Sequence, residues 1–145
     1  MNARITLLGK PEGFPDRSLL IEWLLLLAGH FEVYIERLSY AFVSEAEMLS
    51  LNQKHLNHDT DTDIITFSYG TSTQMSAEVF ICPSRLYENA KTYSQTPENE
   101  LIRLMSHGFL HALGHQDKSA EDQVKMRHLE DQCIAMFHVK QNNYV

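Results

Sequence analysis

The sequence predicts an α+β fold in which a small mixed β-sheet packs with about five helices. Short segments rich in β-branched and aromatic residues are typical of strands. Longer segments have the apolar spacing and the boundary residues of helices. The two kinds of segment do not alternate regularly, which favours an α+β arrangement. With 145 residues, 43% of them hydrophobic, the chain is long enough for one domain over residues 1–145.

The first predicted element is a strand over residues 3–9, ARITLLG. A helix is predicted next over residues 17–30, because Asp16 stands in the N-cap position and the apolar spacing of RSLLIEWLLLLAGH suits a buried helix. SYAFVS, residues 39–44, then has the composition of a second strand.

The middle of the chain is predicted to form a helix and two strands. Ser44 and Glu47 have the spacing of a capping box, which predicts a helix over residues 45–56. DIITFSYG, residues 63–70, and AEVFICP, residues 77–83, are predicted to be neighbouring strands.

The remaining elements are predicted to be helices. The first begins at the proline that ends the preceding strand and runs to about Tyr93. Thr96 and the proline after it supply an N-cap and a first-turn proline for the next helix, which ends at Gly114. A last helix is predicted over residues 120–137.

Composition and charge limit the possible functions. The most apolar stretch, residues 21–30, is too short to span a bilayer and contains Glu22. The N-terminus lacks the apolar core of a signal peptide, so a cytoplasmic protein without membrane contact is expected. The formal net charge of -7 argues against wide, non-specific binding of nucleic acid, which requires a basic surface.

Several metal-binding side chains lie close together in SHGFLHALGHQD, residues 106–117. His107 and His111 stand at i and i+4 of a predicted helix, so both imidazoles point to one face and can bind one ion. Gly114 can turn the chain back by adopting a left-handed conformation, which brings Asp117 within reach as the preferred third ligand. His115 is the alternative third ligand if the helix continues past the glycine.

The spacing H-x-x-x-H-x-x-G-x-x-D is similar to the long motif of zinc metalloproteases, with Asp117 in the place of the third histidine. We therefore expect one Zn²⁺ per chain, with a metal-bound water in the position that the protein leaves open. The proteases carry a catalytic glutamate directly after the first histidine, and Gly108 occupies that position here. The pattern favours hydrolysis of a substrate other than a peptide.

The sequence also resembles the YbeY family, the metal-dependent endoribonucleases that mature ribosomal RNA. The resemblance covers about residues 38–136. LNQKHLNHDTDTDIITFSYG and AEVFICP look like the family's LN-x-x-Y-R … T-[DN]-V-L-S-F segment and its G-D-I-x-I-x strand. HGFLHALGHQD and KMRHLEDQCI look like its HG-x-LH-L-x-G-Y-D-H segment and its closing M-x-x-x-E helix.

The resemblance implies a zinc-dependent endoribonuclease that is specific for single strands and acts in ribosomal RNA maturation, ribosome assembly and quality control. Its implied partners are ribosomal RNA, the ribosomal subunit and assembly proteins. His107 and His111 match the family's first two metal ligands, and Asp117 stands where the third ligand is usually histidine. His115 takes the place of a tyrosine that is not a ligand in the family.

One departure from the family pattern affects substrate binding. Leu56 stands in the place of the family's arginine, which is a candidate phosphate contact. Other cationic side chains are therefore the candidates for RNA binding: Lys54, His55, His58, Arg85, Arg103 and Lys118. The candidates for the general base are Asp63, Glu78 and His115.

The sequence leaves two alternative functions open. The first is a metal-dependent hydrolase that acts on a non-RNA substrate, such as a small phosphoester. The second is a non-catalytic ribosome-assembly factor that contains zinc. Structural zinc sites usually have four protein ligands, and binding by both His115 and Asp117 would complete such a set.

Overall fold

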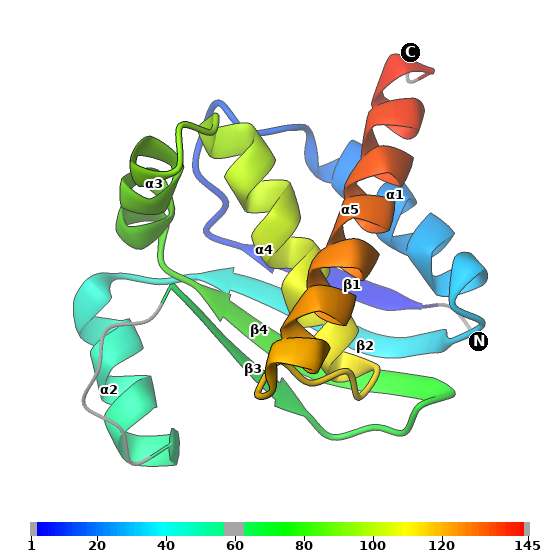
Figure 1. The fold of residues 1–145 in the computed structure, drawn as a ribbon, viewed down its shortest axis with the longest axis horizontal. Helices are drawn as coiled ribbons and strands as arrows, with labels where there is room; N and C mark the ends of the chain where they lie inside the picture. The colour runs from blue at the N-terminus through cyan, green and yellow to red at the C-terminus, as the bar shows by residue number, and fades with distance from the viewer. Residues whose placement is uncertain (1–2, 57–62, 144–145) are drawn as a thin grey trace.

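The computed structural model describes residues 3–56 and 63–143, without the side chains of residues 55 and 56. Its elements, in chain order, are β1 (Arg4–Leu8), α1 (Arg17–His30), β2 (Tyr34–Phe42), α2 (Glu45–Leu56), β3 (Ile64–Ser68), β4 (Gln74–Ile81), α3 (Pro83–Thr92), α4 (Pro97–Ala112) and α5 (Ala120–Asn142). Figure 1 shows their arrangement.

The four strands form one mixed sheet in the order β1-β2-β4-β3 (Figure 1). β1 pairs with β2 in parallel, and β2 pairs with β4 in parallel. Among the described residues, β3 pairs with β4 alone, in antiparallel orientation, and therefore lies at an edge of the sheet. The predicted α+β class, with a small mixed sheet and helices packed on it, is confirmed.

The second strand begins at Tyr34, earlier than the predicted start at residue 39. The register between β2 and β4 shifts between Ile35 and Arg37, which leaves Glu36 as an extra residue in a bulge. Two exposed charged residues in succession interrupt the alternation by which a strand is identified in a sequence, so the first half of β2 was missed.

The helices agree closely with the prediction, except for one capping side chain and one helix end. Asp16 occupies the N-cap position of α1, but its side chain makes no capping hydrogen bond. α5 continues to Asn142 rather than ending at residue 137. The predicted capping box of α2 is present, since the backbone N–H of Glu47 donates to Ser44 Oγ at 3.2 Å and that of Ser44 donates to Glu47 Oε1 at 3.3 Å.

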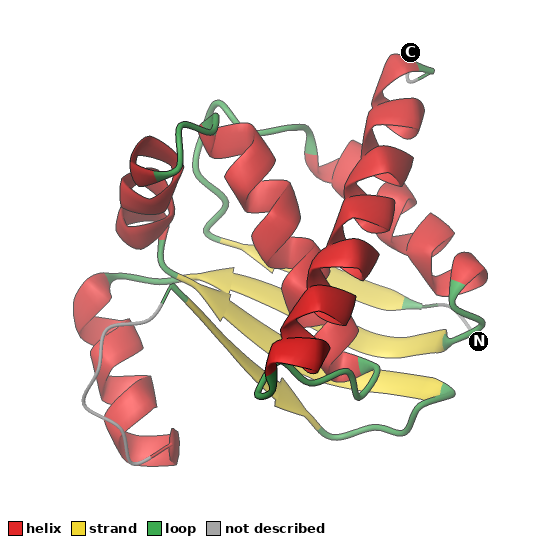
Figure 2. Ribbon diagram, in the orientation of Figure 1, coloured by secondary structure: helices red, strands yellow, loops and turns green. Residues whose placement is uncertain are grey.

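The main hydrophobic core lies between the sheet and the layer of helices that contains α1, α4 and α5 (Figure 2). Its largest fully buried side chains include Trp23, Tyr40, Phe109 and Phe137. The indole N–H of Trp23 donates to the carbonyl of Cys133 at 3.0 Å, and the hydroxyl of Tyr40 donates to a carbonyl of α4 at 2.8 Å. These bonds satisfy buried polar atoms and tie α1 to α5 and β2 to α4.

The opposite face of the sheet is partly covered by α2. Met48 and Leu51 pack there with Ile65, Phe67 and Phe80. Among the described residues, no helix combines the length and the apolar character that crossing a membrane requires.

Candidate metal centre

The end of α4 positions the candidate ligands. The N–H of His115 donates to the carbonyl of Leu110 at 3.1 Å, and the N–H of Gly114 donates to the carbonyl of His111 at 2.9 Å. These two bonds form a Schellman motif, in which Gly114 has a φ of 106° that favours glycine. The helix therefore stops before His115, and the chain folds back so that Asp117 approaches the last turn of α4.

Three side chains converge beside this turn. His107 Nε2 and His111 Nε2 lie 2.9 Å apart. Asp117 Oδ2 lies 3.3 Å from His107 Nε2 and 3.4 Å from His111 Nε2. In the part of the chain that the structure describes, these residues form the one group of His, Cys, Asp and Glu side chains that could hold a metal ion.

The other ring nitrogen of each histidine has a hydrogen-bond acceptor. His107 Nδ1 lies 2.6 Å from Glu130 Oε2, and His111 Nδ1 lies 2.8 Å from the carbonyl oxygen of His115. A carbonyl or a carboxylate accepts a hydrogen bond, so each Nδ1 carries a proton, and the Nε2 atom of each ring is the one that can bind a metal. These two Nε2 atoms and the Asp117 carboxylate oxygen converge on one point, an arrangement that a cation between them would stabilise. The donor set therefore fits a metal ion.

Glu130 is buried at the contact between α4 and α5. Its Oε1 accepts a hydrogen bond from Arg103 at 2.8 Å, and the same guanidinium pairs with Asp131 at 2.8 Å. Burial opposes ionisation of Glu130, but the bonds from His107 and Arg103 outweigh it and lower the pKa of the Glu130 carboxyl. Burial likewise lowers the pKa of His107, but the Glu130 carboxylate outweighs burial and leaves the His107 pKa above its ordinary value.

A cavity of about 620 Å³ opens beside the three candidate ligands. It is lined by Asp63, Ile64, Ile65, Thr66, Ser68, His107, His111, Asp117 and Lys118. The wall opposite α4 is thus the edge strand β3, and Lys118 is a cation at the rim. Asp63 is held by Asn89, whose Nδ2 donates to Asp63 Oδ2 at 2.6 Å.

α4 lies very close to the sheet at Gly108. A Cβ atom at this position would lie 2.8 Å from Val79 Cγ1 and 3.4 Å from Ile64 Cδ1. Real Cβ atoms essentially never come within 3.0 Å of another residue in this way. The position after the first histidine therefore faces β4, and it has no room for the glutamate that zinc proteases carry there.

The structure separates the three candidate bases. Asp63 lines the cavity. Glu78 alternates with the core residues Ala77 and Val79 of β4, so its side chain lies on the opposite face of the sheet, where it contacts Tyr69. This position on the other face of the sheet argues against Glu78 as the general base.

His115 is not part of the group of side chains that could hold a metal ion. It lines a separate cavity with Asp122, Lys125 and Met126, and its carbonyl oxygen lies 2.8 Å from His111 Nδ1. Burial, followed by the nearby Lys125, lowers the pKa of the His115 imidazole. This geometry favours Asp117 over His115 as the third ligand.

The predicted RNA-binding cations are scattered over the protein. Lys118 alone among those described lines the cavity. Arg85 pairs with Glu88 at 3.3 Å, and Arg103 is occupied by two carboxylates. Lys54 is exposed on α2. The side chains of His55 and Leu56, together with the whole of His58, lie outside what the structure describes.

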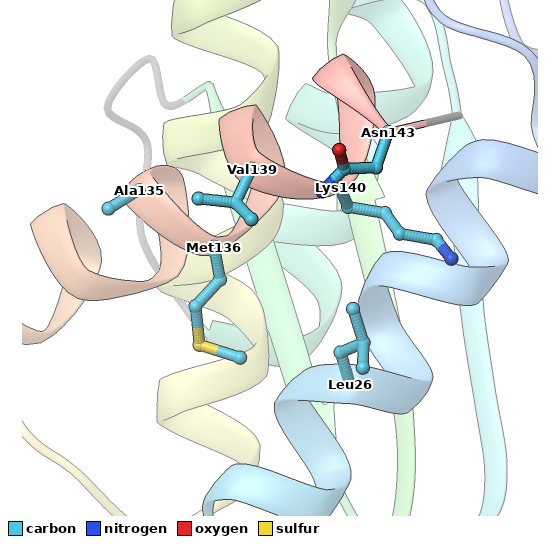
Figure 3. Close-up of a pocket in the computed structure, with 6 residues that line it drawn as sticks. All are labelled: Leu26, Ala135, Met136, Val139, Lys140 and Asn143. Carbon is cyan, nitrogen blue, oxygen red and sulfur yellow. The ribbon is translucent and has the colours of Figure 1, made fainter. Parts of the chain in front are cut away.

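A second hollow, of about 430 Å³, lies between α1 and the end of α5 (Figure 3). It is lined by Leu26, Ala135, Met136, Val139, Lys140 and Asn143. Its lining is mostly apolar, and the Lys140 ammonium lies 3.9 Å from the Glu22 carboxylate. Convergent ionisable groups, the usual mark of a catalytic site, occur instead in the cavity beside the histidines.

The sequence pattern identifies His107, His111 and Asp117 as candidate metal ligands. It assigns no role to Glu130, and Arg103 is predicted only as an RNA-binding residue. A signal for Glu130 was nevertheless present. It is an acidic residue that follows apolar positions on the inner face of α5, where a carboxylate needs a partner.

Comparisons with known proteins agree with this architecture. The sequence model of the family described as Endoribonuclease YbeY matches residues 17–138. Proteins with that name from Flavobacterium psychrophilum and Flavobacterium johnsoniae are 42% and 39% identical to the chain. These matches cover 72% and 83% of this chain, and 75% and 86% of the relatives.

The fold also has a solved counterpart. The solution structure of TM1509 from Thermotoga maritima superimposes with a TM-score of 0.65 and 25% sequence identity, covering 96% of this chain and 92% of that one. Because the family match spans most of the chain and includes the whole candidate metal centre, this chain belongs to the YbeY endoribonuclease family.

Proposed function

We propose that this protein is a metal-dependent endoribonuclease and that His107, His111 and Asp117 hold one Zn²⁺. The observation that carries the proposal is the convergence of two imidazole Nε2 atoms and a carboxylate oxygen beside an open cavity. Imidazole and carboxylate are ordinary zinc ligands, and three protein ligands are typical of a catalytic rather than a structural site. Membership of an endoribonuclease family supports RNA as the substrate.

When bound, the metal would supply Lewis-acid catalysis and lower the pKa of water. The protein side chains have separate tasks. Lys118, at the rim of the cavity, binds the phosphate that is to be cleaved. Asn89 holds Asp63 Oδ2, and this orients the carboxylate so that its Oδ1 takes the proton from the attacking water. The edge strand β3 forms the wall along which the RNA strand lies.

The finer part of the proposal is a cytoplasmic role in ribosomal RNA maturation and ribosome assembly, with single-stranded RNA as the substrate. An unpaired strand can enter an open cavity beside a sheet edge more readily than a duplex can. The net charge of -7, and the presence of one cation among the described residues that line the cavity, predict weak binding to free RNA. Affinity would then come from the ribosomal subunit or assembly proteins.

The test is cleavage of a labelled single-stranded RNA by the purified protein, with and without a chelator. His111→Ala, purified identically, is the control for contaminating ribonucleases. We expect cleavage that the chelator abolishes and that falls to background in the variant. Equal cleavage by the two proteins would refute the assignment of the activity to this site.

The non-catalytic alternative makes a different prediction about the metal. A structural zinc site would be closed by a fourth protein ligand. The position of the His115 side chain in a separate cavity argues against such closure. X-ray absorption of the zinc-loaded protein should therefore show four ligands: three from the protein and one oxygen from solvent.

A further inference from the structure

One part of the candidate metal centre comes from a helix that carries none of the three proposed ligands. Glu130 lies in the middle of α5 and is only 5% exposed. One carboxylate oxygen lies 2.6 Å from His107 Nδ1, and the other accepts a hydrogen bond from Arg103 at 2.8 Å. Both oxygens of this buried carboxylate are thus used, each by a different partner.

We propose that Glu130, clamped by Arg103, is a positioning residue that holds His107 in the tautomer whose Nε2 is bare, and so prepares the centre for a cation. This inference rests on the metal site assigned above. It also gives Arg103 a role other than contact with RNA. The clamp is needed because a buried carboxylate without a cationic partner would be costly and would have no fixed orientation.

The two histidines differ in what fixes their tautomer. His111 Nδ1 donates to the backbone carbonyl of His115, which belongs to the turn that ends α4. This acceptor is a backbone atom, so substitution of a side chain does not remove it. The tautomer of His107 depends instead on the Glu130 side chain, which a substitution can change.

Glutamine at position 130 would have nearly the same shape but could not serve both neighbours. An amide has one oxygen, and the charged guanidinium of Arg103 would take it, because a charge-assisted hydrogen bond is the stronger one. The amide N–H₂ group would then face His107 Nδ1, which could only accept. The His107 proton would move to Nε2, the atom that should bind the metal.

Alanine at position 130 removes the acceptor without imposing the wrong tautomer, because water can take its place. The proposal therefore predicts an order that is the reverse of steric similarity. Metal affinity should fall from wild type to Glu130→Ala and should be lowest in Glu130→Gln. A merely structural role predicts the opposite order, because glutamine fills the space that alanine would leave empty.

The experiment has two readouts on the full chain. Nitrogen-15 NMR of the metal-free protein at about pH 9, well above the ordinary histidine pKa, reports which ring nitrogen carries the proton. Competition with a chromogenic chelator gives the Zn²⁺ dissociation constant. Asp131→Asn is the matched control, since it removes the exposed carboxylate partner of Arg103 but leaves Glu130 in place.

We expect His107 to carry its proton on Nδ1 in the wild type and on Nε2 in Glu130→Gln. Zinc affinity should fall roughly 10- to 100-fold in that variant, which is the usual effect of losing such a partner, and should stay within about two-fold in Asp131→Asn. A wild-type His107 protonated on Nε2, or a Glu130→Gln variant with unchanged tautomer and affinity, would overturn the proposal. A wild-type protein that binds no zinc, but whose tautomer still depends on Glu130, would refute the proposed metal function and leave the tautomer control standing.

Discussion

Gly108 offers the sharpest test of how the fold builds this site. It lies on α4 directly after the ligand candidate His107, where the helix comes closest to the sheet. An alanine there would place its methyl group 2.8 Å from Val79 Cγ1 and 3.1 Å from Val79 Cγ2. Favourable carbon–carbon contacts lie at about 3.5–4.0 Å, so both distances are repulsive. Gly108→Ala should therefore destabilise the protein although it improves the helix.

Two opposing effects determine the size of the loss. Alanine in place of glycine within a helix gains about 1 kcal/mol. Forcing an extra methyl group into a packed core costs about 1–3 kcal/mol. Val79 is only 1% exposed and β-branched, and both of its methyl groups face the new atom, so rotation of χ1 gives little relief. We expect a net loss of about 1 kcal/mol in the free energy of unfolding.

The measurement is urea unfolding of the metal-free protein, so that metal binding does not add to stability. Gly29→Ala is the matched control: this glycine also lies in a helix, and an added Cβ meets no atom within 4 Å. It should stabilise by up to about 1 kcal/mol. In a Val79→Ala background, Gly108→Ala should become stabilising, which corresponds to a coupling of about 2 kcal/mol. A stabilising Gly108→Ala in the wild-type background would refute the argument.

Three further predictions concern the ligands, the cation at the rim and a buried acid. Asp117→Ala should weaken zinc binding more than His115→Ala does, as measured by chelator competition, and the reverse order would transfer the third ligand to His115. Lys118→Ala should raise the KM for RNA several-fold while leaving zinc affinity unchanged, and an unchanged KM would remove Lys118 from the substrate site. Burial, followed by the nearby Asp63, raises the pKa of Glu100, so its ionisation destabilises the fold at neutral pH. Glu100→Gln should therefore raise the Tm at neutral pH. The gain should shrink as the pH falls through the raised pKa of the folded state and should be absent below the ordinary glutamate pKa of about 4.3; a gain that does not depend on pH would contradict this origin.

The candidate ligands could be predicted from the sequence because they are local. His107 and His111 are related by the helical repeat, and Gly114 predicts the turn that brings Asp117 close to them. The start of β2 could not be predicted, because the bulge at Glu36 breaks the periodic pattern. The contact between His107 and Glu130 joins two helices, and nothing in the spacing of either helix encodes how they pack.

The sequence alone does not distinguish Asp63 from Glu78 as the general base. Asp63 and Glu78 both lie in or beside neighbouring strands, and their sequence contexts are equally compatible with a role in the site. The antiparallel register pairs Phe67 with Glu78, which places the Glu78 side chain on the face opposite α4. Which face of β4 turns toward the helices is set by how the sheet packs, and this is a tertiary property.

The charges around the cavity connect the metal to the substrate. Asp63 and Asp117 line it, Glu130 is buried behind His107, and Lys118 is the cation among the lining residues that the structure describes. A phosphodiester would meet net negative charge there unless a divalent cation first occupied the centre. The metal proposed for catalysis would therefore also be required for substrate binding. An acidic protein can then act on RNA without a broad basic surface, provided that the cation is in place before the RNA arrives. A His107 tautomer preset by Glu130 would favour this early binding of the cation.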